Sequence, residues 1–153
     1  MTGVQTCALP IFPINLIGGQ VFAGSTRLLP IATNSSTAIY YGDVVKLLAG
    51  GTVGRDTGTD AATPVGVFLG CTYTDPVYGK TFRQYYAGTT NITDIQAYVL
   101  DDPDALFKVA VVSSGTTISY LARTDVGKNA VLVQNSGSTI NGDSKVEIGR
   151  AHV

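Results

Sequence analysis

The sequence predicts an all-β domain, and two features of its composition lead to that prediction. Residues 12–146 contain many Asp, Thr and Gly but no Glu, and these abundant types are poor helix formers. β-Branched and aromatic residues gather in short runs between turn residues, which is typical of strands. About seven such runs at regular spacing favour a small single-domain barrel or sandwich. The chain length of 153 residues suits one domain.

Three strands are expected in the first half of the chain. The run 37–41 is rich in β-branched and aromatic residues, and a Gly-Asp pair ends it. The run 44–48 resumes extended structure until a Gly-Gly pair stops it. The third run, 64–75, is longer, and Gly66 and Gly70 within it suit a bend or a bulge.

The third strand is expected to form an antiparallel hairpin with residues 81–86. Residues 75–79 between the two runs have the Asp, Pro and Gly that turns prefer. Residues 95–99 alternate between apolar and smaller or polar side chains, as a half-buried strand does. A further strand is expected at 106–112.

The last part of the chain is expected to finish with one more strand. Residues 116–122 fit a helical turn as well as a strand. Residues 125–129 carry turn residues, and 130–134 is the next apolar run. The Gly, Ser and Asn residues of 136–142 predict a loop or hairpin turn.

Both ends of the chain resemble translated sequencing adapter. Residues 147–153 can be written GAG-ATC-GGA-AGA-GCA-CAC-GTC, and the reverse complement of nearly all of this string occurs within a back-translation of residues 1–11. Two protein termini have no physical reason to be reverse complements. We therefore expect both segments to be non-native and the β domain to span 12–146. We also expect the fold to be truncated at its C-terminal end, because the natural chain should continue past Val146.

Residues 12–146 lack the residue types on which most catalytic sites depend. They contain no His, which is the usual general base near neutral pH and a common metal ligand. Cys71 is their only cysteine, which excludes an internal disulfide and a CxxC unit. No SxxK pattern and no GxGxxG loop occur. We therefore expect no enzyme activity, no cofactor, and no catalytic, cofactor-binding or metal-ligating residue.

Two acidic segments and one thiol are the nearest candidates for a site. Residues 55–60 place two carboxylates around a Gly but lack the bidentate Glu of a calcium loop. Residues 101–104 hold three Asp and a Pro. Turn formation explains both segments better than metal binding does, because Asp bonds nearby backbone amides. Cys71 lies in an apolar run, which indicates a small buried hydrophobe rather than a reactive thiol.

Charge and hydropathy argue against two classes of partner. The formal net charge is −1, and there is no cluster of basic residues to attract nucleic acid. No apolar run approaches the roughly 18 residues of a membrane-spanning helix. We expect neither a nucleic acid nor a membrane as partner.

Short motifs follow one another through about residues 20–146. They are Gly42–Lys46, Val65–Asp75, Gln84–Gly88, Ala97–Pro103, Phe107–Val109, Gly127–Ala130, Gly137-Ser138 and Gly142–Ser144. In this order they resemble a group of small virion structural proteins of tailed phages that is common in metagenomic collections. The resemblance implies a protein that decorates or cements the capsid surface of the virion, with the major capsid protein as partner. By the same analogy we expect a homo-oligomer, a trimer on local threefold positions.

The tyrosines agree with such a binding role. The chain has eight, including the pairs Tyr40-Tyr41 and Tyr85-Tyr86. Tyr gives a large contact area at low cost in conformational entropy. Adjacent strand residues face opposite sides, so one Tyr of each pair could be core and the other surface. The alternative, which we favour for any single Tyr, is that all are ordinary residues of the sheet.

A ligand-binding β-sandwich, such as a carbohydrate-binding or adhesion module, is the alternative function. Coplanar exposed aromatics on one sheet face, or an Asp-lined calcium site, would favour that alternative. An exposed apolar rim next to an unpaired strand edge would favour assembly on a capsid.

Overall fold

The computed structural model describes residues 9–57, 63–89, 91–114 and 117–149. Strands dominate these residues, and none of them forms an α-helix. Their single helical element is one 3-10 turn at Arg123–Asp125. The prediction of an all-β protein is confirmed.

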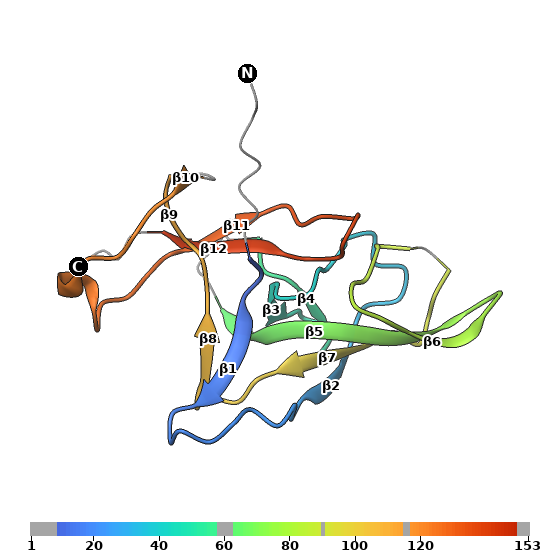
Figure 1. The fold of residues 1–153 in the computed structure, drawn as a ribbon. Coiled ribbons are helices and arrows are strands. Elements are labelled where there is room, and N and C mark those ends of the chain that lie inside the picture. The colour runs from blue at the N-terminus through green and yellow to red at the C-terminus, as the bar shows by residue number, and fades with distance from the viewer. Residues whose placement is uncertain (1–8, 58–62, 90, 115–116, 150–153) are drawn as a thin grey trace.

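Three sheets make up the fold (Figure 1). The largest contains β2 (Arg27–Pro30), β3 (Val44–Leu47), β4 (Val53–Arg55), β5 (Pro64–Asp75), β6 (Gly79–Arg83) and β7 (Gln96–Leu100). Its strand order is β2-β7-β5-β3-β4, and β6 pairs with β5. All of these pairs are antiparallel.

The other two sheets are smaller. A two-stranded ribbon pairs β1 (Phe12–Leu16) with β8 (Ala105–Lys108). A four-stranded sheet contains β9 (Val111–Ser114), β10 (Thr117–Ile118), β11 (Leu132–Asn135) and β12 (Lys145–Gly149). Its order is β10-β9-β12-β11, and the β9–β12 pair is parallel.

The six-stranded sheet curls around its own core. Its edge strands are β2 and β4, and Ile31, the residue after β2, forms one isolated parallel bridge with Val53 in β4. The bridge is not continued, so the sheet is not closed as a barrel within the described residues. The first core, inside the curl, consists of Ile31, Ile39, Val45, Val53, Phe68, Cys71, Tyr73, Tyr86, Ile92, Ile95, Ala97 and Val99.

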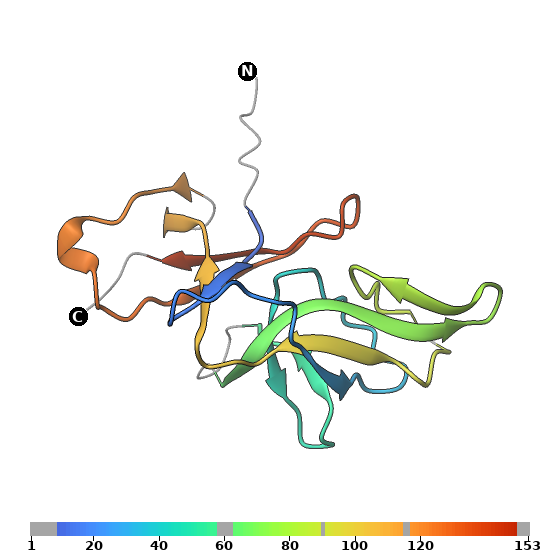
Figure 2. The ribbon, with the colours of Figure 1, turned by 60° about the horizontal axis from the view of Figure 1, so that its bottom comes forward.

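A second, smaller core lies on the other face of this sheet. Val44 and Val67 are buried there together with Ile11 and Val146. Phe107, Val109, Leu69 and Leu132 pack against them and are partly buried. Figure 2 shows the resulting layers, with the red β11–β12 hairpin lying over the green strand β5. The sheet is therefore covered on both faces.

A bulge in β5 decides which side chains reach the first core. Phe68 and Cys71 are three residues apart, yet both belong to that core. In a regular strand this odd spacing would place them on opposite faces. The register between β5 and β7 shifts between Phe68 and Gly70, and Gly70 has φ 138°, which only glycine adopts readily. The predicted bulge at Gly70 is confirmed.

Most of the expected strands are found close to their expected positions. The run 44–48 contains β3, 64–75 is β5, 95–99 overlaps β7 and 130–134 overlaps β11. The hairpin partner of β5 is β6, as expected, although it ends at Arg83. The expected strand at 106–112 is instead divided into β8 and β9.

The strand expected at 37–41 is wrong. This segment forms only isolated bridges, among them Ile39 with Tyr86. Ile39 and Tyr40 are both buried, whereas successive side chains of a half-buried strand alternate. Ile39 belongs to the first core and Tyr40 stacks on Tyr85, so these residues serve packing instead of regular pairing.

Four strands were not expected from the sequence: β1, β2, β4 and β12. Each has three to five residues, which is too short for a clear alternating pattern. Of the ambiguous segment 116–122, Thr117–Ile118 is strand β10, and residue 116 lies outside the described residues.

The fold includes residues beyond both expected boundaries of the β domain. Ile11 is buried in the second core. Strand β12 continues past Val146, where Glu147 pairs with Val133 and accepts a 2.8 Å hydrogen bond from the side-chain amide of Asn135. These contacts place the residues in the fold, and the adapter origin of residues 1–11 and 147–153 stays a prediction.

Candidate functional site

A buried polar network joins the curled sheet to the β11–β12 hairpin. The carboxylate of Asp43 is fully buried and accepts hydrogen bonds from the Tyr40 backbone N–H (2.8 Å) and the Ser144 hydroxyl. The guanidinium Nε of Arg55 lies 3.4 Å from the same carboxylate, and its Nη2 donates to the Asn135 carbonyl. Burial raises the pKa of Asp43, while these donors and the Arg55 charge limit the rise. The network is therefore a structural latch between segments 101 residues apart.

Two stacked tyrosines lie beside this latch. The rings of Tyr40 and Tyr85 are 5.8 Å apart and only 12° from parallel. A Cβ on Gly137 would lie 2.4 Å from the Tyr40 ring, and one on Gly142 would lie 2.6 Å from the Tyr85 ring. The Gly-Ser and Gly-Asp-Ser motifs of the hairpin are therefore packing residues, because any larger side chain would collide with the rings.

Each tyrosine pair has one buried and one half-buried member. Tyr40 and Tyr86 are buried, as expected for one member of each pair. Their neighbours Tyr41 and Tyr85 are half-buried and so are less enclosed than Tyr40 and Tyr86. Residues 40–41 and 85–86 are not in regular strands, and the hairpin packs over them.

The first acidic segment, 55–60, is described only as far as Thr57, so Asp60 lies outside the described residues. Asp56 is buried, and its carboxylate lies 3.9 Å from the ammonium of Lys46. This carboxylate therefore forms part of the sheet's internal ion pairing.

The second acidic segment forms a turn after β7. The carboxylate of Asp101 lies 2.9 Å from Arg27 Nε, and that of Asp102 accepts a 2.9 Å hydrogen bond from the Asp104 backbone N–H. This is the turn chemistry expected for the segment. In the part of the chain that the structure describes, no group of three or more His, Cys, Asp or Glu is arranged to hold a metal.

Cys71 is a core residue. Its side chain is completely buried in the first core, which confirms the prediction of a small buried hydrophobe. Burial raises the pKa of its thiol to about 12, and the charge of Arg83 opposes this only in part. The thiol is protonated and shielded near neutral pH.

Exposed apolar side chains gather on the β1–β8 ribbon. Phe12 and Ile14 in β1 and Leu106 in β8 are all more than two-fifths exposed. Ile17 and Val21, in the turn after β1, are 65% and 78% exposed. The turn folds back on the strand through a bridge between Asn15 and Val21. We call these five apolar residues the ribbon patch: Phe12, Ile14, Ile17, Val21 and Leu106.

A second apolar feature is the tip of the β5–β6 hairpin, which extends away from the rest of the fold (Figure 1). Val77 and Tyr78 at this tip are 80% and 77% exposed. The turn is rigid, because the Asp75 carboxylate accepts hydrogen bonds from the backbone N–H groups of Val77 (2.8 Å) and Tyr78 (3.1 Å). The same two hydrogen bonds lower the pKa of Asp75. The tip therefore exposes two side chains, Val77 and Tyr78, on an ordered turn.

The aromatics near this hairpin do not form a flat platform. Phe82 and Tyr98 have ring centroids 5.7 Å apart, but their planes meet at 61°. Sugar-binding faces need coplanar exposed rings, and this pair is arranged edge to face. The sequence-based criterion for a carbohydrate-binding module is not met at this position.

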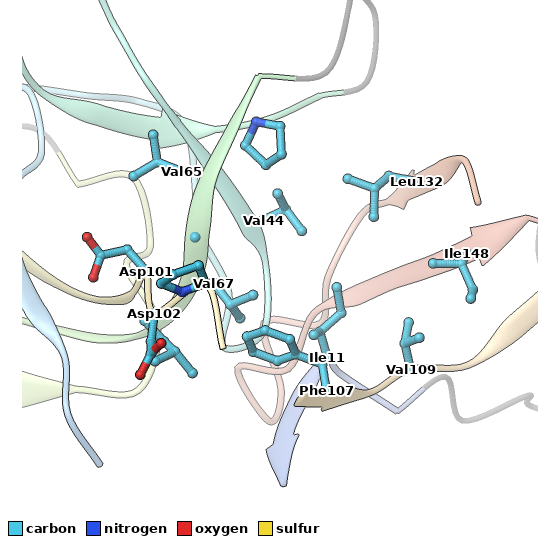
Figure 3. Close-up of a pocket in the computed structure, with 14 residues that line it drawn as sticks. Ile11, Val44, Val65, Val67, Asp101, Asp102, Phe107, Val109, Leu132 and Ile148 are labelled. Atoms are coloured by element: carbon cyan, nitrogen blue, oxygen red, sulfur yellow. The ribbon is translucent and has the colours of Figure 1, made fainter. Parts of the chain in front are cut away.

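A cavity of about 490 Å³ lies between the curled sheet and the smaller sheets (Figure 3). Its lining residues come from the curled sheet and from the smaller sheets, and most of their side chains are aliphatic. The two Asp side chains of the lining, Asp101 and Asp102, lie together at one end, away from Leu132 and Ile148. No pattern in the sequence indicates this cavity, because its lining comes from segments that are far apart in the chain.

Known protein-family models, curated proteins and solved structures include none that matches this chain. No helix among the described residues has both the length and the apolar character to cross a bilayer.

Proposed function

We propose that this chain is a non-enzymatic structural protein of a tailed-phage head that decorates or cements the outer capsid surface. Its partner is then the major capsid protein, and its place is the surface of the virion. We also propose that it acts as a homotrimer. The ribbon patch is the single observation that carries the proposal best.

The ribbon patch supports assembly because it is an apolar surface built on ordered strands. Contiguous exposed apolar side chains are characteristic of surfaces that bind other proteins. Phe12 and Leu106 lie on paired strands, so their positions are held by the ribbon backbone. Little conformational entropy is lost when such a surface is covered.

The tip of the β5–β6 hairpin offers a second contact point. Val77 and Tyr78 extend from a turn held by Asp75, away from the ribbon patch. Two separate contacts allow one copy to touch two neighbouring subunits of a lattice. Many such copies add avidity, so each contact can be weak.

The curled sheet supplies a rigid body for these contacts. We propose that it is the framework of a small barrel, supported by the bridge between Ile31 and Val53 where its edges meet. The motifs that resemble phage structural proteins hold this body together, since Asp43 and Ser144 of two motifs meet in the latch.

Co-sedimentation with capsids tests the proposal. The purified chain is mixed with capsids assembled from a tailed-phage major capsid protein, and the amount of chain in the pellet is measured. We expect saturable binding at high copy number, lost at least about tenfold in a Phe12→Asp/Leu106→Asp variant, which corresponds to about 1.4 kcal/mol. Val126→Asp is the matched control, because Val126 is 82% exposed and lies outside the ribbon patch.

Two outcomes would contradict the proposal. The first is a wild-type chain that stays in the supernatant and is missing from purified virions by mass spectrometry. The second is saturable glycan binding in an array, which would favour the ligand-binding module instead.

A further inference from the structure

We propose that Asn141 is a site of spontaneous deamidation and that docking of the β11–β12 hairpin controls the reaction. Asn141-Gly142 is the sole Asn-Gly pair of the sequence, and it lies in the turn between β11 and β12. The Asn141 side chain is exposed, so water reaches it. This modification is independent of the proposed role in assembly, because it needs no partner protein.

The reactivity of an Asn-Gly pair comes from the missing side chain of glycine. The backbone nitrogen of Gly142 attacks the side-chain carbonyl carbon of Asn141, and the amide nitrogen leaves as ammonia with the proton of Gly142. The cyclic imide that remains takes up one water molecule and opens at either carbonyl, which gives aspartate or isoaspartate. Glycine favours the attack because it has no Cβ in the way and its backbone is the freest to adopt the required conformation.

The native turn keeps the two reacting groups apart. The Gly142 N–H donates a 2.9 Å hydrogen bond to the Ser138 carbonyl oxygen, which opposes loss of its proton. The side-chain amide of Asn141 is held by the next residue instead. Its nitrogen donates to the Asp143 carboxylate at 2.7 Å, and its oxygen accepts from the Asp143 backbone N–H at 3.3 Å. Deamidation therefore requires local opening of the turn.

Contacts with segments far away in the chain oppose this opening. The Gly142 carbonyl oxygen accepts a 2.9 Å hydrogen bond from the Tyr41 backbone N–H. Gly142 also packs so closely on the Tyr85 ring that an added Cβ would lie 2.6 Å away from it. The side-chain amide of Gln84 donates to the Asp143 carboxylate at 3.1 Å. The turn therefore opens readily only when the hairpin leaves these contacts, so docking sets the rate of deamidation.

Both products conflict with the docked turn. In aspartate, a carboxylate oxygen replaces the amide nitrogen that donates to Asp143, so two negative charges meet in place of a 2.7 Å hydrogen bond. In isoaspartate, the backbone gains a methylene group between residues 141 and 142. This insertion shifts Gly142 relative to Tyr41 and Tyr85, which it contacts in the native turn. Deamidation is therefore a one-way switch that weakens docking of the hairpin.

Peptide mapping by mass spectrometry tests the control by docking. The whole chain is incubated at mildly alkaline pH with and without urea, and deamidation of Asn141 is followed over time. We expect the reaction to be at least about tenfold slower in the folded chain than in urea, which corresponds to an opening free energy of at least about 1.4 kcal/mol.

Two glycine variants connect the rate to docking. Gly137→Ala places a Cβ 2.4 Å from the Tyr40 ring and should accelerate deamidation in the absence of urea. Gly50→Ala is the matched control, because its Cβ meets nothing within 4 Å, and it should react at the wild-type rate. If Gly137→Ala fails to fold by circular dichroism, Ser144→Ala takes its place, since it removes the hydroxyl that Asp43 accepts from.

A second pair of variants tests the effect of the product. Asn141→Asp carries the charge of the aspartate product, whereas Asn141→Ala removes the reactive amide without adding a charge. We expect Asn141→Asp to unfold at a lower urea concentration than Asn141→Ala at neutral pH, because only the former places a second carboxylate against Asp143.

Four results would overturn the proposal. They are equal rates of deamidation with and without urea, an Asn141 that does not react even in urea, a wild-type rate in the variant that disturbs docking, and equal urea midpoints for Asn141→Asp and Asn141→Ala. None of these measurements involves a capsid, so their outcome is separate from that of the proposed function.

Discussion

Asp43 is a carboxylate enclosed by protein on all sides, and its donors come from three separate segments. Tyr40 is its neighbour in sequence, Arg55 comes from β4, and Ser144 comes from the turn before β12. A buried carboxylate is costly unless it is paired and hydrogen-bonded. The latch therefore favours this docking of the hairpin, since another placement would remove the Ser144 hydroxyl from the Asp43 carboxylate.

The raised pKa of Asp43 predicts a measurable pH dependence. The native state holds the Asp43 proton more tightly than the unfolded chain, whose Asp pKa is about 3.9. Tighter proton binding at Asp43 therefore stabilises the folded state. This contribution to the free energy of unfolding is fully present below the pKa of Asp in the unfolded chain, and it is lost as pH rises through the pKa of Asp43 in the folded state. In urea unfolding between about pH 7 and about pH 4, we expect this contribution to grow as pH falls.

The variant Asp43→Asn isolates that contribution. Its unfolding free energy should depend less on pH than that of the wild type, and only the raised pKa of Glu147 should still act in the same direction. Asp104→Asn, at an exposed position, should keep the wild-type slope. Equal slopes for wild type and Asp43→Asn would contradict the burial argument.

Cys71 should be inert while the protein is folded. With its pKa raised to about 12, its thiolate fraction at about pH 8 is about a thousandfold below that of a free cysteine. In a Cys7→Ser background, iodoacetamide should label Cys71 only after denaturant is added, as measured by intact mass. Labelling of the folded chain at the rate of the unfolded chain would refute its burial in the core.

At the scale of single elements, the bulge in β5 is the feature with the widest effect. Gly70 shifts the alternation of the strand so that Cys71 and Tyr73 join Phe68 in the first core. A Cβ at this position would lie 2.8 Å from the Phe82 ring and 3.1 Å from the Arg83 carbonyl oxygen. The positive φ and this crowding both demand glycine.

Gly70→Ala should therefore destabilise the fold by roughly 1–3 kcal/mol in urea unfolding. Gly50→Ala is the matched control, because nothing lies within 4 Å of its added Cβ and its φ is not positive. The control should stay within about 0.5 kcal/mol of the wild type. Equal stability of the two variants would mean that the bulge does not need glycine.

The strand pattern was predicted where side chains alternate over enough residues. Strand β5 has twelve residues and β7 shows clear alternation, so the sequence located both. Strands β2 and β4 have four and three residues, and their pairing depends on partners far along the chain. The strand predicted at 37–41 is not formed, because β-branched and aromatic residues suit a packed core segment as well as a strand.

At the scale of the whole molecule, the second core makes the two layers depend on each other. Val146 of β12 is completely buried against Val44 and Val67 of the curled sheet. The hairpin that carries Val146 is also held by the latch at Asp43. Apolar packing and the buried network therefore act on the same interface between the layers.

Val146→Ala tests whether the layers unfold together. We expect one cooperative transition that is less stable by about 1–3 kcal/mol, with tyrosine fluorescence and far-ultraviolet circular dichroism changing together. Val131→Ala, at a 59% exposed position beside β11, should have little effect. Separate transitions for the two signals would show that the hairpin is only loosely attached.

The all-β class, the bulge at Gly70 and the burial of Cys71 follow from the amino-acid sequence without knowledge of the fold. Each of these depends on local chemistry: poor helix formers, a residue free to adopt positive φ, and a small apolar side chain in an apolar run. Only the tertiary structure decided the latch, the ribbon patch and the cavity. Asp43 and Ser144 are 101 residues apart, and Val67 and Ile148 line one cavity from two different sheets. Such contacts follow from how the strands pair and stack, and no local pattern encodes that arrangement.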